Sequence, residues 1–221
     1  GKSEMLITLI LGLAMRYDPS VINFVLVDFK GGTAFKMFER LPHVVNLVTS
    51  LQGNAGERTF IALEFEMKRR AKMLADAGVP HIVDYRSAGY HRADQLPADS
   101  KVKPAPFPFL FIIIDEFAEM VKEMPQFRPK LDSVTRLGRA YGVSLILATQ
   151  RPAGAVTDQM RANIKFKICL RVETAEDSRE LLRASDAAFL PTGVPGRAYL
   201  MIGNDNSQLM QVAYGSYRYT P

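Results

Sequence analysis

The feature that most constrains the fold is the continuous apolar run at residues 109–114, which ends abruptly in Asp115 and Glu116. The run is rich in β-branched and aromatic residues and follows closely spaced prolines, which is typical of a strand buried on both faces. Other apolar strand-like runs alternate along the chain with helix-like segments. The sequence therefore predicts an α/β fold with a mainly parallel central sheet and helices on both faces.

Apolar periodicity and turn residues predict where the individual elements lie. Helices are expected over residues 3–17, 57–77, 127–141 and 174–183, with another ending at residue 123. Strands are expected over residues 23–29, 109–115, 143–148, 166–172, 196–202 and 208–214. The last two strands are expected to pair as a C-terminal β-hairpin, and residues 87–108 are expected to form a surface loop.

Several residues are assigned to the core or to helix ends by their spacing. Gly142 is expected to end the helix before it. The buried side of helix 57–77 is expected to carry Phe60, Leu63, Phe65, Met67 and Leu74. Core positions are also expected for Met15, Met67, Met73 and Met120.

The acid pair Asp115 and Glu116 indicates a cation at the end of the buried strand, because two carboxylates there are costly without one. This is the Walker B arrangement, in which the first acid holds the Mg²⁺ of MgATP and the second orients the attacking water. The alternative is a strand that ends at the surface with two solvated acids.

The opening residues Gly1, Lys2 and Ser3 match the last three positions of the phosphate-binding signature G-x-x-x-x-G-K-[ST]. Such a tripeptide also occurs by chance, and Ser3 alone could be a helix N-cap. Together with the acid pair, however, it predicts a site for ATP and Mg²⁺. The strand and the glycines that should precede Gly1 are absent, so we expect this chain to be part of a longer polypeptide.

Composition bounds the class of protein without deciding its function. A length of 221 residues suits one α/β domain, residues 1–221. The single Cys169 excludes a disulfide framework within the chain and is expected to be a small core residue in a reducing compartment. The net charge of +5 is spread along the chain and leaves an anionic partner open. The apolar segment 6–15 is too short to cross a bilayer, so any membrane anchor is expected outside the chain.

Polar residues follow the strand expected at 143–148, in the sequence Thr149-Gln150-Arg151-Pro152. At this point the sequence resembles the FtsK/SpoIIIE family of RecA-like motor ATPases, and the resemblance covers almost the whole chain. Within that family it is similar to the EccC branch, the motors of type VII secretion, through the segments 28–35, 41–45, 190–191 and 195–200. DNA translocases of the family more usually show Asp-Pro-Lys where this chain has Asp28-Phe29-Lys30.

The resemblance implies a role for each matching residue. Lys2 and Ser3 would contact phosphate and Mg²⁺ within a nucleotide site that begins at Gly1 and includes Glu4. Asp115 would be the metal-binding acid and Glu116 the catalytic glutamate. Gln150 or Thr149 would sense the γ-phosphate. The glycines of Lys30-Gly31-Gly32 are expected to allow a tight turn near the ATP edge.

RecA-like motors are expected to receive an arginine from a neighbouring subunit during hydrolysis. Arg139 is slightly favoured for that role, because it lies between the acid pair and the sensor strand in the sequence. Arg69, Arg70 and Arg179 are the other candidates. For each of them an ordinary solvated helix arginine is an equally good interpretation.

The function implied by the resemblance is a motor ATPase that exports small helical WXG-type proteins through a membrane complex. We expect a hexamer, a cytoplasmic position within a larger membrane-anchored protein, and no DNA partner. Two alternatives stay open. One is a DNA translocase of the same fold, and the other is a weakly hydrolysing regulatory or scaffold module, which the missing glycines would favour.

Overall fold

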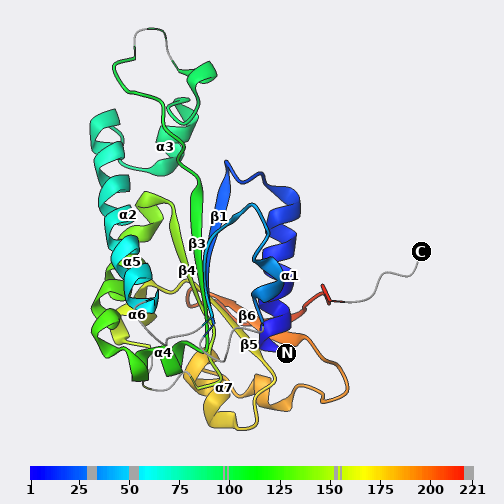
Figure 1. The fold of residues 1–221 in the computed structure, drawn as a ribbon. Coiled ribbons are helices and arrows are strands. Elements are labelled where there is room, and N and C mark those ends of the chain that lie inside the picture. The colour runs from blue at the N-terminus through cyan, green and yellow to red at the C-terminus, as the bar shows by residue number, and fades with distance from the viewer. Residues whose placement is uncertain are drawn as a thin grey trace, which may run out of the picture.

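Four parallel strands form the main sheet in the order β2-β1-β3-β4 (Figure 1). The strands are β1 (Ile22–Asp28), β2 (Val44–Val48), β3 (Phe109–Asp115) and β4 (Val143–Leu147). The computed structural model describes residues 1–28, 34–49, 55–96, 98, 100–151, 154 and 156–216. As predicted, the apolar run before Asp115 is an interior strand, paired with β1 on one side and β4 on the other.

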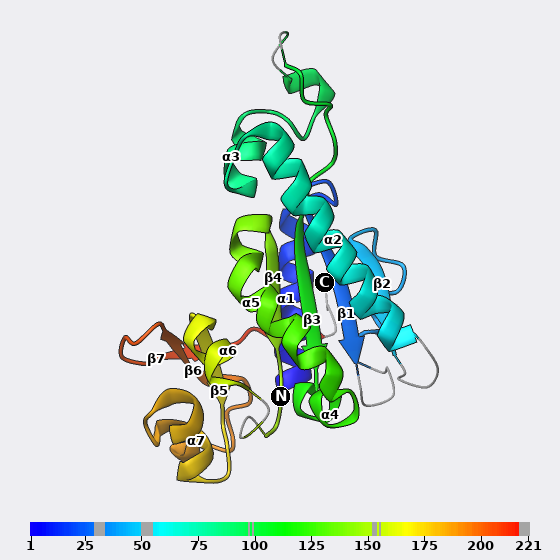
Figure 2. The same cartoon turned by 90° about the vertical axis from the view of Figure 1, so that its left-hand side faces the viewer.

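Helices cover both faces of this sheet, as the sequence predicted (Figures 1 and 2). One face carries α1, and α2 and α5 lie on the other. The α-helices are α1 (Lys2–Arg16), α2 (Ala55–Ala77), α3 (Ile82–Ser87), α4 (Phe117–Glu123), α5 (Arg128–Tyr141), α6 (Asp158–Asn163) and α7 (Ala175–Leu182). Short 3₁₀ turns are η1 (Lys36–Phe38), η2 (Ala93–Gln95), η3 (Pro125–Phe127) and η4 (Asp186–Phe189). No helix within the described ranges is long and apolar enough to span a membrane.

Alternate residues of β1 and β3 point into two separate cores, as the period of two in a strand requires. On the α1 face, Phe24, Leu26 and Ile113 pack against Leu6 and Ile10. On the α2 and α5 face, the neighbouring strand positions pack into a second apolar core, which contains Val27, Ile112, Ile114, Phe60 and Leu131. Even-numbered residues of β1 and odd-numbered residues of β3 therefore face α1, and the residues between them face α2 and α5.

A second, antiparallel sheet contains β5 (Phe166–Leu170), β6 (Arg197–Ile202) and β7 (Gln208–Gln211). The predicted hairpin of β6 and β7 is confirmed, but the strand predicted at 166–172 joins this hairpin rather than the parallel sheet. Cys169 lies in β5 and is 3% exposed, as expected of a core residue. Burial raises the pKa of its thiol to about 11. It therefore stays a protonated core group at neutral pH.

The segment after β7 returns to the first helix. The Thr8 hydroxyl donates to the carbonyl of Ala213 at 2.9 Å and accepts the N–H of Gly215 at 3.1 Å. Ser216 donates to the Glu4 carboxylate at 2.7 Å. The outer side of α1 is thus held by a segment more than 200 positions away in the sequence.

Two core assignments made from spacing are wrong. Phe65 is 65% exposed and Met15 is 87% exposed. At about 100° per residue, Phe65 lies about 140° around α2 from the buried Phe60, and Met15 is turned by the same angle from the buried Ile10. Both side chains therefore point away from the sheet. Met67 and Met120 are buried as expected, and Met73 is half-buried.

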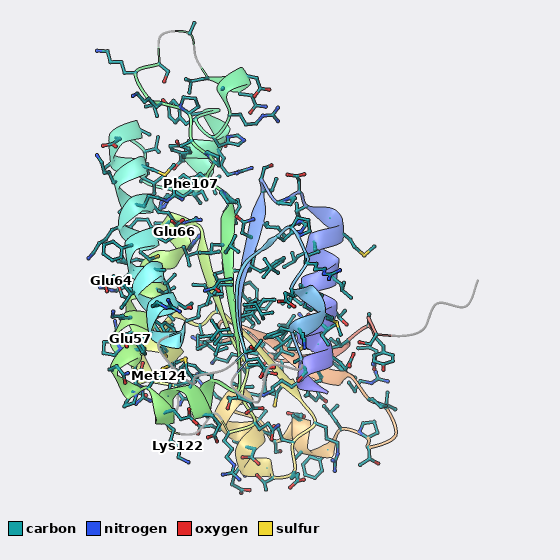
Figure 3. All side chains as sticks on the ribbon, viewed as in Figure 1. Glu57, Glu64, Glu66, Phe107, Lys122 and Met124 are labelled. Carbon is teal, nitrogen blue, oxygen red and sulfur yellow. The ribbon has the colours of Figure 1, made fainter. Side chains whose placement is uncertain are left out.

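The expected surface loop at 87–108 is largely confirmed for its described residues. Apart from the last residue of α3 and the three-residue turn η2 they form no helix or strand, and most are exposed or half-buried. Phe107, however, is fully buried. Phe107 packs against Tyr85 in an edge-to-face arrangement with ring centroids 4.9 Å apart. Figure 3 shows Phe107 beside the end of α2. One aromatic side chain thus anchors a segment that composition alone marks as loop.

Arg70 joins these elements from inside the protein. Its side chain is 2% exposed and its guanidinium lies 5.0 Å from the centroid of the Phe107 ring. It donates to Glu66 at 2.7 Å and to the carbonyl of Tyr141 at 2.9 Å, next to Gly142. Gly142 ends α5 with φ of 70°, confirming the predicted cap. Burial opposes ionisation of Glu66, but the hydrogen bonds from its arginine neighbours hold the pKa of that carboxyl below its usual value.

Replacing Arg70 by alanine is expected to lower the free energy of unfolding by about 3 kcal/mol, because the half-buried Glu66 carboxylate and the Tyr141 carbonyl each lose a charged donor and the buried arginine stem is removed. Chemical denaturation measures this change. Arg69→Ala is the matched control, since Arg69 shares Glu66 as partner but its side chain is 46% exposed. The control is expected to cost less than about 1 kcal/mol. Equal losses in the two variants would contradict the structural role of Arg70.

Candidate functional site

The acid pair and the opening tripeptide meet at one end of the parallel sheet. Asp115 is the last residue of β3, and Lys2 and Ser3 lie in the first turn of α1. The amino end of α1 therefore faces the carboxyl ends of the strands, where α/β folds commonly bind ligands. Residues more than 110 positions apart in the sequence come into direct contact there.

Lys2 binds both carboxylates. Its Nζ lies 2.8 Å from Asp115 Oδ1 and also donates to Glu116 Oε1. Asp115 and Glu116 are each 4% exposed, so the ammonium compensates two buried charges that would otherwise be costly. The Lys2 ammonium is thus a cation at the end of β3, where the sequence predicted one.

Ser3 and Asp115 provide oxygen ligands side by side. The Ser3 hydroxyl donates to Asp115 Oδ2 at 3.2 Å. A hydroxyl and a carboxylate are the hard oxygen donors that Mg²⁺ prefers, and they are the pair that holds this ion in P-loop ATPases. The residues present therefore fit a magnesium ion, which Ser3 and Asp115 would hold.

Gly1 leaves the start of α1 open. It is the N-cap residue and has no side chain to bond the N–H groups of the first turn. A fifteen-residue helix with unsatisfied N–H groups at its start attracts anions through those groups and through its dipole. The positive end of α1 and the Lys2 ammonium thus favour an anion at the same place.

The backbone of Glu116 is in the left-handed region, with φ of 57°. A non-glycine residue pays about 1 kcal/mol for this conformation. The following residue pins the turn, because Phe117 N–H donates to the carbonyl of Ala148 at 2.8 Å. The turn is thereby fixed to the end of β4, and the Glu116 carboxylate is held near Lys2.

The predicted sensor residues lie on the next strand end. Thr149 and Gln150 line a small hollow of about 210 Å³ together with Glu116, Glu119 and Arg151. The Thr149 hydroxyl accepts a hydrogen bond from the backbone N–H of Arg151. The Gln150 side chain is exposed. The structure therefore brings both candidates to Glu116, while their role in sensing phosphate stays a prediction. Pro152 and the Lys30-Gly31-Gly32 turn lie outside the described residues.

Glu4 differs from its neighbours in the first turn. Its carboxylate accepts a hydrogen bond from Ser216 and not from a residue at the acid pair. Its predicted contact with nucleotide is not supported by this arrangement and stays a prediction.

The candidate arginines are spread over the molecule. Arg139 is exposed in the last turn of α5, beside the amino end of β4, so the length of that strand, about 16 Å, separates it from the acid edge. Within one molecule it is far from Glu116. Arg70 is buried and cannot be presented to a neighbour. Arg69 is bonded to Glu66, and Arg179 lies 3.4 Å from Glu176.

A larger cavity of about 600 Å³ lies elsewhere, between α2 and the sheet. Its walls come from residues such as Val25, Leu63, Ile112 and Arg69, and none of its lining residues belongs to the acid pair or the opening tripeptide. Size alone would point to this cavity, but the convergence of charged groups and oxygen ligands identifies the end of β3 as the site of chemistry.

Sequence reasoning gave no role to a third buried carboxylate at this edge. Asp28 ends β1, is 3% exposed, and lies opposite Asp115 in the pairing of β1 with β3. The available signal was an acidic residue near the end of the strand predicted at 23–29. Only the register of β1 with β3 shows that this acid lies beside Asp115.

Known proteins are similar to this chain in sequence and in fold. A model of the FtsK/SpoIIIE family matches residues 1–154. The type VII secretion system protein EssC of Staphylococcus aureus strain Mu50 is 40% identical over 220 residues, which cover 99% of this chain and 14% of EssC. The chain thus spans about a seventh of the length of this relative.

Two solved structures are also similar. The cytoplasmic domain of the type VII secretion ATPase EccC from Thermomonospora curvata gives a TM-score of 0.88 at 38% identity, covering 100% of this chain and 25% of that one. The pCW3 conjugation coupling protein TcpA, solved with ATPγS, gives a TM-score of 0.76 at 26% identity, covering 97% of this chain and 57% of that one. On the family match and the identity to EssC, this chain belongs to the FtsK/SpoIIIE family of P-loop ATPases.

Proposed function

We propose that residues 1–221 act as one MgATP-hydrolysing module of a motor protein. The contact of Lys2 with both Asp115 and Glu116 is the observation that carries this proposal. It supports the proposal because it brings together a lysine suited to bind phosphate, an acid suited to bind a metal ion and a second acid suited to act as a base. The opening of α1 adds N–H groups suited to an anion.

The roles follow from what each side chain can hold. Lys2 would exchange its two carboxylate partners for phosphate oxygens when a nucleotide enters. Ser3 and Asp115 would hold Mg²⁺, which supplies charge neutralisation of the transferred phosphoryl group. Released from Lys2, Glu116 would orient and deprotonate the attacking water. Thr149 or Gln150, on the same hollow as Glu116, would contact the γ-phosphate.

The wider process follows from the relatives. The 40% identity to EssC and the 0.88 TM-score with EccC support a place in a type VII secretion system. On this proposal the module belongs to a larger membrane-anchored protein, lies on its cytoplasmic side, assembles as a hexamer and drives export of small helical WXG-type proteins. Arg139 would act on the nucleotide of a neighbouring subunit, because it lies far from the acid pair of its own molecule.

Glu116→Gln is expected to lower the rate of ATP hydrolysis about a hundredfold or more, because the water loses its base. ATP affinity is expected to hold or rise, since Lys2 loses a competing carboxylate. Steady-state turnover and equilibrium binding in the full-length protein measure the two effects. Glu119→Gln, an exposed glutamate on the same hollow, is the matched control. Undiminished turnover in the Glu116 variant would remove it from the catalytic role.

Lys2→Ala is expected to weaken binding of ATP by at least about tenfold, because a charged donor to phosphate is lost. Calorimetric titration of ATP with Mg²⁺ measures the affinity. Lys72→Ala is the control, since Lys72 is a well-exposed lysine paired only locally with Asp76. An unchanged affinity in the Lys2 variant would show that the opening tripeptide is not a phosphate site.

Duplex DNA is expected to leave the ATPase rate unchanged, which distinguishes a secretion motor from a DNA translocase. A translocase would be stimulated by DNA, and the stimulation would fall steeply with salt. The measurement is the ATPase rate at low and moderate salt, with and without DNA. Salt-sensitive stimulation would favour the translocase, and absence of turnover in the wild-type protein would favour the regulatory module.

A further inference from the structure

Asp28 lies in the row of side chains that faces α1. In β1 this row runs through Ile22, Phe24 and Leu26, which pack in the core beneath α1. Asp28 is the next residue with the same parity, so its side chain points to the same face. On one side, β1 pairs with β3.

Asp115 continues the matching row of β3. Ile113 packs in the same α1-facing core, and Asp115 follows it by two residues. The two aspartates are direct partners in the parallel pairing of β1 with β3. Paired strands lie about 4.8 Å apart, and partners in a parallel pair point the same way. The two carboxylates are therefore neighbours on the face where Ser3 and Lys2 contact Asp115.

The environment of Asp28 is closed to water, since the residue is 3% exposed. Its Oδ2 accepts the N–H of Ala34 at 3.2 Å. Through this bond Asp28 holds the start of the segment that leads to η1, where Phe35 and Phe38 are buried in the α1-facing core. Asp28 thus connects the end of β1 to Ala34 by a hydrogen bond.

Adjacent buried carboxylates repel one another, and the repulsion is relieved best by a cation of high charge. Lys2 supplies one positive charge to Asp115 and Glu116. When phosphate draws this lysine away, Asp115 loses the positive charge at 2.8 Å from its Oδ1. A divalent ion held by Ser3 and Asp115 would replace it, and the charge of Asp28 would strengthen its attraction.

We propose that Asp28 is a positioning residue of the nucleotide site, which acts through Asp115 to favour Mg²⁺ when a nucleotide replaces the carboxylates on Lys2. This inference rests on the proposed function. It assigns Asp28 no direct contact with the metal and no part in proton transfer. Its effect is on the coupling between Mg²⁺ and nucleotide binding.

The test is binding of ATPγS to the full-length protein, titrated with Mg²⁺ and repeated with EDTA. Asp28→Asn keeps an oxygen that can accept the Ala34 N–H but removes the charge. We expect it to raise the Mg²⁺ concentration needed for half-maximal retention of ATPγS by about tenfold, from the loss of one unit charge near a divalent ion. Affinity in EDTA should be unchanged or higher. Asp28→Glu is expected to restore part of the Mg²⁺ dependence.

The controls separate this role from a purely structural one. Asp205→Asn removes a charge from an exposed turn and should match the wild type. If Asp28→Asn also matches the wild type while Asp28→Ala is impaired, the residue only holds Ala34 and the inference is overturned. If the wild-type protein binds no ATPγS at all, the proposed function itself fails. Wild-type binding with an unchanged Asp28→Asn variant overturns the inference alone.

Discussion

The contact between the Lys2 ammonium and the carboxylates of Asp115 and Glu116 is the interaction on which the site depends. It ties the start of α1 to the end of β3 and balances charges that are almost fully buried. The positions of these three side chains are fixed by apolar packing and by backbone hydrogen bonds around them. Two apolar cores hold the helices on either face of the sheet, and a hydrogen bond from Phe117 to Ala148 fixes the turn at Glu116.

This arrangement explains how one group of side chains can serve two states. In the structure, Lys2 and the two carboxylates compensate one another's charges. On the proposed function, a triphosphate would compete for the same ammonium, and a metal ion would replace the positive charge beside the acids. Nucleotide binding would then also release the glutamate for catalysis.

The main sheet and much of the site could be predicted because their signals are local. The apolar run at 109–114 can hardly be anything but an interior strand, and an acid pair at its end demands a cation. Asp28 was not recognised because its meaning depends on register between strands distant in the sequence. The left-handed backbone conformation of Glu116 could not be predicted from the sequence, because glutamate rarely adopts this conformation.

Two core expectations failed because apolar character alone does not place a side chain on the buried side of a helix. Phe65 and Met15 are apolar but lie on the outer sides of their helices. Composition did identify the loop before β3, but not the burial of Phe107 against Tyr85 and Arg70 within it. The strand at 166–170 could have joined either sheet on its composition, and its antiparallel pairing with β6 decides the outcome.

The bonds from Thr8 and Glu4 to the segment 213–216 have a mechanical consequence. These hydrogen bonds hold the outer side of α1, within two turns of Lys2. Helix α1 therefore packs on the sheet with one side and contacts segment 213–216 with the other. A displacement of segment 213–216 would therefore act directly on α1, the helix that carries Lys2.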